Sequence, residues 1–152
     1  MRYYITAVCI IILDQLVKWK TRAALPVGGS IPVIGDFFAI THVATTGAAF
    51  GMLAGRTGML IVISGALIII MIVLLALVLR KQSLHWSAKT AATMIVAGGI
   101  GNMIDRVLFG SVTDMFDFSI FPPVFNVADI FVTTGCAFLI LYVIVGDKKK
   151  QG

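Results

Sequence analysis

Long uncharged segments alternate with short polar ones along the chain, and this alternation predicts membrane-spanning helices. Residues 57–79 contain no charged side chain and are followed by Arg80 and Lys81, and residues 130–146 are uncharged as well. About 20 apolar residues at 1.5 Å per residue cross a hydrocarbon core of about 30 Å. The pattern therefore predicts its clearest span over residues 57–79 and a last span over about 126–146.

Two further spans are predicted where charges interrupt the apolar pattern, over about 3–20 and 87–107. The uncharged run at residues 3–13 makes only about 16 Å of helix, so a span there must carry Asp14 into the membrane. Asp14 stands four residues before Lys18, the favourable order for an ion pair within a helix. A cleaved signal peptide is the alternative, but no small-residue cleavage site follows the run. We therefore expect a retained span.

The segments between the predicted spans differ in character. Residues 24–57 are rich in glycine and proline and contain a strand-like run at 37–43, which predicts an extramembrane loop with some sheet. A short outer link through Pro122 and Pro123 is expected between Asp114 and Asp129. The expected fold is an all-α membrane protein, a single integral membrane domain over residues 1–152. It has four transmembrane helices and a small extracytoplasmic β-containing loop region.

Composition supports this class and excludes others. Hydrophobic residues make up 59% of the 152 positions, which is too apolar for a soluble domain of this size. The net charge of +5 comes from basic residues that flank hydrophobic runs without interleaved aromatics, so no nucleic-acid partner is expected. The two cysteines and two histidines lack metal-ligand spacing. No metal and no cofactor is expected.

The distribution of basic residues orients the predicted spans. Seven of the twelve basic residues lie at one set of span ends, and the remaining five are spread over the longer segments at the other. Because cytoplasmic segments carry an excess of Lys and Arg, both termini are predicted to be cytoplasmic. Asp14, Asp105 and Asp129 then lie near the outer face, and Asp114 lies in the outer link. Ionisable groups at membrane depth are costly and usually functional, so a polar site is predicted there.

Polar residues concentrate in residues 98–129, which hold four of the seven acids and both asparagines. Asn102 shares a helix face with Asp105 and Arg106 at spacings of three and four. Asp105 has two interpretations, a site residue or a residue that ties helices together. Arg106 carries a permanently charged fork suited to a carboxylate or a polar substrate group.

Asn126 and Asp129 match a helix start, with an N-cap residue and an acid at the third helical position. Capping explains their spacing but not an acid at membrane depth. Two aspartates close together there could share a proton, with one activating water and the other donating to a scissile carbonyl oxygen.

The sequence resembles the bacterial lipoprotein signal peptidases, also called signal peptidase II. The resemblance covers nearly the whole chain and rests on five motifs in order. They are Asp14-Gln15-Leu16-Val17-Lys18; Thr46-Gly47-Ala48-Ala49-Phe50; Gly98-Gly99-Ile100-Gly101-Asn102-Met103-Ile104-Asp105-Arg106; Gly110-Ser111-Val112-Thr113-Asp114; and Phe125-Asn126-Val127-Ala128-Asp129.

The resemblance implies a four-helix membrane aspartic endopeptidase that cuts a prolipoprotein just before its diacylglyceryl-modified cysteine. It implies Asp114 and Asp129 as the catalytic pair. The residues implied to bind substrate or to brace the site are Asp14, Lys18, Gly47, Asn102, Asp105, Arg106 and Asn126. The implied location is the bacterial cytoplasmic membrane, with the site toward the outer leaflet. Lipidated prolipoproteins and membrane lipid are the expected partners, and a monomer is expected.

Two positions depart from the family's pattern. Thr45 stands where the family usually has asparagine, and Asp117 is an additional acid close to Asp114. Asp117 is the main rival to Asp114, followed by Asp105. The motif match at residues 112–114 favours Asp114 with Asp129. Because a helix N-terminus favours negative charge, we expect Asp129 to be the ionised partner and Asp114 the protonated one.

Two other functions remain as alternatives. Four spans with intramembrane acids also suit a small ion- or proton-coupled transporter subunit, although no midplane acid or inverted repeat is visible. The other alternative is a diverged, non-catalytic paralogue that binds lipidated peptides. The reason to consider it is that Thr45 replaces the family's usual asparagine.

Overall fold

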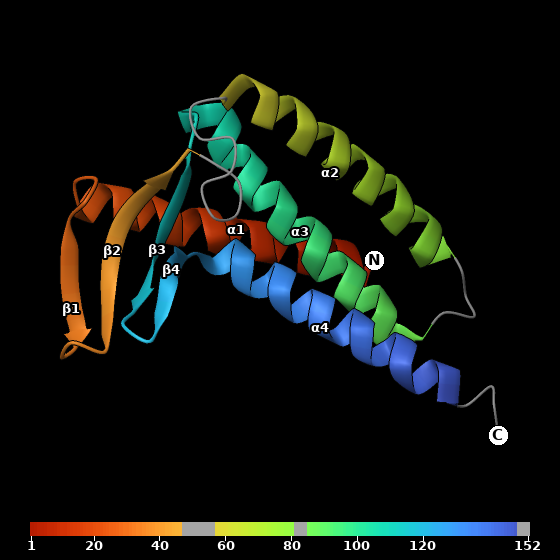
Figure 1. Ribbon diagram of the computed structural model, residues 1–152. Coiled ribbons are helices and arrows are strands. Elements are labelled where there is room, and N and C mark those ends of the chain that lie inside the picture. Colours follow the sequence, from red (N-terminus) through yellow and green to blue (C-terminus); the bar gives the residue numbers. More distant parts are fainter. Residues whose placement is uncertain (47–56, 81–84, 149–152) are drawn as a thin grey trace.

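The computed structural model describes residues 1–46, 57–80 and 85–148. Within these residues the chain forms four long helices and a four-stranded antiparallel sheet at one end of the helices (Figure 1). In chain order the elements are α1 (Arg2–Ala24), β1 (Ser30–Ile34), β2 (Phe38–Thr45), α2 (Thr57–Arg80), α3 (Trp86–Phe109), β3 (Val112–Phe118), β4 (Phe121–Phe125) and α4 (Val127–Lys148).

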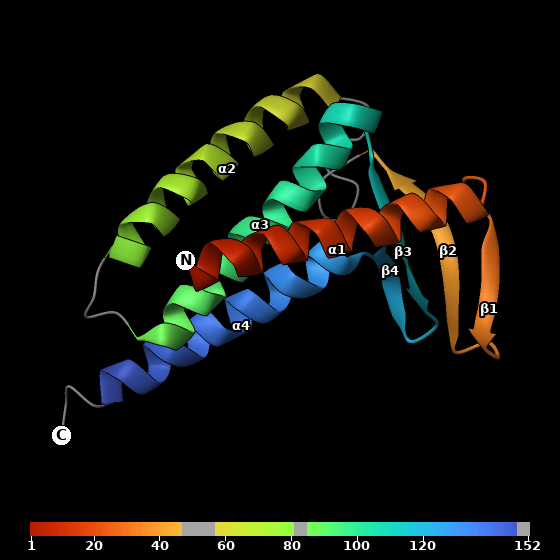
Figure 2. The ribbon, with the colours of Figure 1, turned by 180° about the vertical axis from the view of Figure 1, so that it is seen from behind.

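Helix α3 lies at the centre of the helical layer. It packs against α1 and α4 on one side, while α2 lies on the side of α3 away from α4 (Figures 1 and 2). Gly98 permits the close approach of α3 and α4, because a Cβ at this position would lie 2.5 Å from the carbonyl oxygen of Ala128. Small residues allow such close contacts between helices in membranes.

Length and composition alone mark only part of this helical layer as membrane-spanning. Among the described residues, α3 and residues Val127–Ile144 of α4 are long and apolar enough to cross a bilayer. Residues Gly65–Arg80 of α2 form a shorter apolar stretch. Helix α1 does not meet the same criterion. The molecule is mostly helical with a small antiparallel sheet, and the four predicted segments all contain helices.

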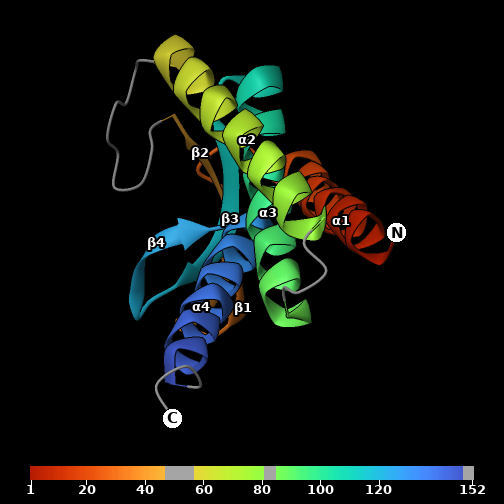
Figure 3. The same ribbon diagram turned by 90° about the vertical axis from the view of Figure 1, so that its right-hand side faces the viewer.

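The sheet joins two segments that are far apart in the sequence, in the order β1-β2-β3-β4. Strands β1 and β2 come from the first loop, where sheet was predicted. Strand β2 pairs with β3, so that Val43 lies opposite Asp114 and Thr45 lies opposite Val112. Strand β3 descends from the end of α3 to the level where α4 begins (Figure 3). The path of β3 places Asp114 beside Asn126, at the start of α4.

The outer link, for which no strand was predicted from the sequence, forms β3 and β4. The prolines of the link lie in β4, at the edge of the sheet. An edge strand tolerates proline because its outward N–H groups have no partner strand. Phenylalanine side chains hold the hairpin to β2, with Phe118 stacked on Phe38 at 4.5 Å and on Phe125 at 5.8 Å between ring centroids.

Candidate active site

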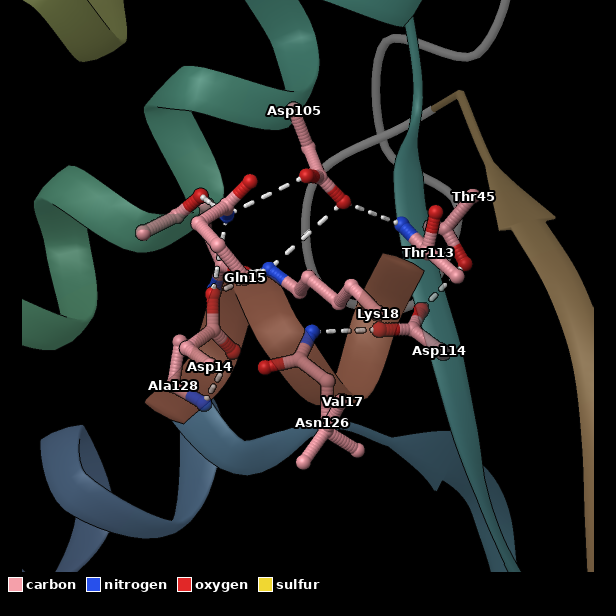
Figure 4. Close-up of polar contacts among 12 residues, drawn as sticks. Asp14, Gln15, Val17, Lys18, Thr45, Asp105, Thr113, Asp114, Asn126 and Ala128 are labelled. Atoms are coloured by element: carbon pink, nitrogen blue, oxygen red, sulfur yellow. Dashed lines mark hydrogen bonds and ion pairs between the residues drawn. The ribbon is translucent and has the colours of Figure 1, made fainter. Parts of the chain in front are cut away.

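Buried polar side chains gather where α1, α3 and the start of α4 meet β3 (Figure 4). Burial of charge is costly unless each group is paired and hydrogen-bonded. The described residues meet this requirement, because no buried side-chain nitrogen or oxygen among them lacks a partner. The buried members that come from these elements are Asp14, Lys18, Asp105, Thr113, Asp114 and Asn126.

Asn126 and Asp129 form the helix start that their spacing predicts. The backbone N–H of Asp129 donates to Oδ1 of Asn126 at 2.9 Å, and the N–H of Asn126 donates back to Oδ2 of Asp129 at 3.3 Å. This reciprocal arrangement is a capping box. The other oxygen, Oδ1 of Asp129, accepts a hydrogen bond from Nδ2 of Asn102 at 2.8 Å. Both carboxylate oxygens of Asp129 therefore face donors at the start of α4.

Asn126 also connects Asp129 to Asp114. Its Nδ2 donates to Oδ1 of Asp114 at 2.5 Å, while its Oδ1 is engaged by the backbone of Asp129. Among the described residues, the hydrogen bonds link the two aspartates only through Asn126 and not carboxyl to carboxyl. The structure thus brings the proposed pair to one site, with an amide between them.

Asp114 lies in β3 and is almost fully buried, with 6% of its surface exposed. Its second oxygen, Oδ2, accepts a hydrogen bond from Oγ1 of Thr45 at 2.5 Å. Burial raises the pKa of Asp114 to about 6, against the opposing hydrogen bonds from Thr45 and Asn126. The charge of Asp129 raises this pKa further, and that of Lys18 lowers it. The result is a carboxyl group that holds its proton closer to neutral pH than an ordinary aspartate does.

Lys18 is the cation at the centre of the cluster and has no exposed side-chain surface. Its Nζ lies 2.9 Å from Oδ2 of Asp14 and 3.6 Å from Oδ2 of Asp105. It also donates to Oδ1 of Asn102 at 2.8 Å. Because that amide oxygen faces the ammonium group, the amide nitrogen of Asn102 faces Asp129. Lys18 therefore fixes the orientation of a side chain that contacts the proposed catalytic pair.

Asp14 connects α1 to the start of α4. Its Oδ1 accepts a hydrogen bond from the backbone N–H of Ala128 at 2.8 Å, so it satisfies one of the open donors of the first helical turn. Gly101 makes room for this carboxylate, because a Cβ there would lie 2.6 Å from Oδ2 of Asp14. The acid of the first helix thus holds the start of the last helix in place.

Asp105 secures the beginning of β3. Its Oδ2 accepts from the backbone N–H of Thr113 at 2.9 Å, and both its oxygens lie 3.4 Å from Nη1 of Arg22. Arg22 also donates to Oγ1 of Thr113 at 2.9 Å. These contacts favour the interpretation of Asp105 as a residue that ties elements together. Its partner Thr113 directly precedes Asp114 in β3.

Sequence reasoning did not assign Gln15, Arg22 or Thr45 to the site. The Nε2 group of Gln15 donates to the carbonyl oxygen of Gly101 at 3.0 Å and contacts Asp14 and Asp105. A signal existed for Arg22, which stands four residues after Lys18 and so shares its helix face. The family pattern marks position 45, but the contact of Thr45 with Asp114 could not be predicted because it depends on the pairing of two distant strands.

Two described residues that were predicted as a site residue or a rival, Arg106 and Asp117, lie outside this hydrogen-bonded cluster. Arg106 makes no side-chain hydrogen bond or ion pair with another described residue, although its guanidinium lies in the field of Asp129, Asp114 and Asp105. Asp117 instead accepts a hydrogen bond from Thr41 at 3.0 Å. Gly47 lies outside the described residues. In the ranges that the structure describes, no group of three His, Cys, Asp or Glu side chains is arranged to hold a metal ion.

Comparison with known proteins decides the family. The family model for signal peptidase (SPase) II matches residues 6–145 of the chain. The chain belongs to the signal peptidase II family. The lipoprotein signal peptidase of Halothermothrix orenii is 41% identical over 149 residues, covering 98% of both chains. That of Brevibacillus brevis is 38% identical over 152 residues, covering 99% of this chain and all of the relative.

A solved structure of a bacterial membrane enzyme matches with a TM-score of 0.86 and 32% identity, over 98% of this chain and 91% of the other. Membership of the signal peptidase II family makes this chain a membrane peptidase and confirms the resemblance seen in the sequence. It disfavours the transporter alternative.

Proposed function

We propose that the chain removes signal peptides from prolipoproteins by cutting immediately before the diacylglyceryl-modified cysteine, with Asp114 and Asp129 as the catalytic pair. The observation that carries this proposal is the position of the two acids on either side of Asn126, at the joint of α1, α3, α4 and β3. The family and its named relatives support the substrate class.

Asp129 acts as the general base in this mechanism. Hydrogen-bond donors from Asn102 and from the backbone of Asn126 favour its ionised form, as does its place in the first turn of α4. It removes a proton from water as the water oxygen attacks the scissile carbonyl carbon. Asp114 is the general acid, since its raised pKa keeps a proton available for the carbonyl oxygen.

The tetrahedral intermediate then collapses. Its hydroxyl proton returns to the carboxylate of Asp114 as the carbonyl re-forms, and the proton held by Asp129 moves to the leaving amine nitrogen. The carbon–nitrogen bond breaks, and both carboxyl groups regain their starting states. The titration belongs to the coupled pair, so a pH profile reports macroscopic values.

The remaining site residues support this pair. Lys18 and Asn102 orient Asp129, Asp14 holds the start of α4, and Asp105 holds the start of β3. Arg106 is proposed to hold a polar group of the substrate, because its planar donor fork lies near both acids. Gly47 is proposed to allow close approach of the substrate backbone.

We further propose that all four helices span the bacterial cytoplasmic membrane, with both termini inside and the site toward the outer leaflet. The helices contain 22 to 24 residues, or about 33 to 36 Å at 1.5 Å per residue. The charges of α1 at Asp14 and Lys18 are fully buried, while Ile5, Val8 and Ile12 are about half exposed. Helix α1 therefore presents an apolar outer surface that suits lipid. The proposed functional unit is a monomer.

The test is cleavage of a diacylglyceryl-modified precursor by purified protein in lipid or detergent. Asp114→Asn and Asp129→Asn should each reduce turnover by at least about 1,000-fold, because each removes an acid or base whose role the other cannot take over. Asp117→Asn is the matched control and should retain turnover, since its partner is Thr41. Circular dichroism and thermal unfolding should show that all three variants fold.

Retained cleavage by either variant of the pair would refute the catalytic assignment. Loss of cleavage in Asp117→Asn alone would transfer the role of Asp114 to the rival acid. A wild-type protein that binds the lipidated precursor without cutting it would instead support the non-catalytic alternative.

A further inference from the structure

The two oxygens of Asp114 have chemically different partners. Oδ1 accepts from Nδ2 of Asn126, and Oδ2 contacts Oγ1 of Thr45, both at 2.5 Å. The side-chain amide of Asn126 cannot flip by 180° without loss of a contact, because its oxygen accepts a hydrogen bond from the backbone N–H of Asp129 at 2.9 Å. Oδ1 of Asp114 therefore always faces an N–H donor.

An amide N–H donates and cannot accept, whereas a hydroxyl does both. Oδ2 can keep its contact with Thr45 when it carries a proton, because the Thr45 oxygen then accepts. It can also keep the contact when ionised, because the hydroxyl then donates. We propose that the Thr45 hydroxyl is a positioning group that selects Oδ2 of Asp114 as the proton-bearing oxygen and holds it through both protonation states. This inference rests on the proposed peptidase function.

The sheet register explains how Thr45 reaches Asp114. Val43 lies opposite Asp114 and Thr45 lies opposite Val112, so Thr45 and Asp114 are diagonal neighbours on one face of the β2–β3 pair. The β-branched side chain of threonine has restricted rotation about its first side-chain bond. The hydroxyl is thus placed by the backbone pairing of β2 with the strand that carries the acid.

Charged groups from the other packed elements also act on Asp114. They are Lys18 from α1, Arg106 from α3 and Asp129 from α4. The titratable group of β2, His42, is directed elsewhere, with its Nδ1 2.8 Å from the carbonyl oxygen of Leu25. These charges remain in every Thr45 variant, so a change in pH dependence between variants reports on the hydroxyl alone.

The hydrogen bond from Thr45 favours the ionised form of Asp114 and so lowers its pKa, against the larger effect of burial. Removal of the hydroxyl should raise that pKa. Activity that requires protonated Asp114 is lost as pH rises through this value. The alkaline limb of the profile should therefore move to higher pH in a variant without the hydroxyl.

The experiment compares wild type, Thr45→Ser, Thr45→Val and Thr45→Ala by steady-state cleavage of a lipidated precursor peptide from about pH 4 to 9. Thr45→Val and Thr45→Ala should shift the alkaline limb upward by about one pH unit and lower kcat about tenfold, with KM changed less than about twofold. Thr45→Ser should keep the wild-type limb and a kcat within about threefold, because it retains the hydroxyl.

If Thr45 had a purely structural role, the activities of Thr45→Ser and Thr45→Val would rank in the opposite order. Valine has nearly the same shape and a good strand propensity, so Thr45→Val would then match or exceed Thr45→Ser, with an unmoved pH profile. That result would overturn the inference while leaving the peptidase function intact. Absence of cleavage in the wild type would instead remove the function and the inference together. Thermal unfolding of each variant identifies any that fail to fold, and Thr45→Ala provides a second deletion of the hydroxyl.

Discussion

Helices α1 and α2 have almost the same length, 23 and 24 residues, but they contact the rest of the molecule through different chemistry. Helix α1 buries charged groups against α3, α4 and β3, and every buried polar atom of the described residues there has a partner. Helix α2 packs chiefly on α3 through apolar side chains. Helix α1 thus determines the geometry of the polar site, whereas α2 contributes an apolar surface.

The boundary between α2 and α3 also contains unfilled space. An apolar groove there is lined by Ile68, Ile100, Met103, Ile104, Val107 and Leu108. Apolar contact is non-directional, so small shifts of α2 change little. Hydrogen bonds and ion pairs depend on distance and angle, and a buried charge that loses its partner is costly. The α1 side should therefore be sensitive to substitution and the α2 side tolerant.

The largest effect is expected from Lys18→Met. The substitution leaves Asp14 and Asp105 without their shared buried cation and releases the amide of Asn102. It should destabilise the protein by about 3–5 kcal/mol and abolish cleavage. Thermal unfolding in detergent and the cleavage assay measure both effects.

Lys20→Met is the control for this prediction, because Lys20 lies on the same helix but is exposed. It should remain within about 0.5 kcal/mol of wild type. Equal losses in the two variants would contradict the assigned difference between the buried and the exposed lysine.

A smaller effect is expected from Gly98→Ala. The added Cβ would lie 2.5 Å from the Ala128 carbonyl oxygen and 2.7 Å from Cγ2 of Val132, so α4 must move away from α3. A cost of about 1–3 kcal/mol is expected, with a marked fall in kcat because Asp129 moves with α4.

Gly99→Ala is the adjacent control. Its Cβ would meet only Cγ1 of Ile68, at 3.8 Å on the α2 side, which is ordinary contact. It should be neutral or stabilising by up to about 1 kcal/mol, since alanine favours helix over glycine. A larger loss from Gly99→Ala than from Gly98→Ala would reverse the comparison between the two sides of α3.

The smallest effect is expected from Ile69→Leu in α2. This side chain is 65% exposed and faces the proposed lipid environment. A volume-conserving change there should alter stability by less than about 0.5 kcal/mol and leave cleavage unchanged. A clear fall in melting temperature would show that α2 makes more specific contacts than its apolar face indicates.

Helix positions were predictable from the sequence because hydrophobic periodicity and charge are local signals. The predicted segment at 57–79 corresponds to α2 at Thr57–Arg80, and the segment at 87–107 corresponds to α3 at Trp86–Phe109. Strands β3 and β4 were not predictable in this way. Strand β3 pairs with β2, about 70 residues earlier in the chain, and Pro122 and Pro123 weaken the local strand signal of β4.

The site was predictable where residue spacing has a direct geometric meaning. The capping box of Asn126 and Asp129 and the ion pair of Asp14 with Lys18 both follow from helical periodicity. Helical spacing places Arg22 on the face of Lys18, but its contacts with Asp105 and Thr113, like that of Thr45 with Asp114, depend on tertiary structure that periodicity does not encode. The catalytic assignments themselves stay predictions until the aspartate variants are assayed.

The salt bridge between Asp14 and Lys18 has a consequence for biosynthesis. Both partners belong to α1, and they lie 2.9 Å apart within a single helical turn. In a nascent first helix, Lys18 thus already has Asp14 as its counter-ion before α3 and α4 exist, while the other charges of α1 are the basic residues Arg2, Lys20 and Arg22 toward its two ends. Those later helices add Asn102 and the backbone N–H of Ala128 as further partners of the two charges. On the proposed assignment, a chain that lacks the final helix has no general base, so the order of synthesis delays proteolysis until the last helix is in place.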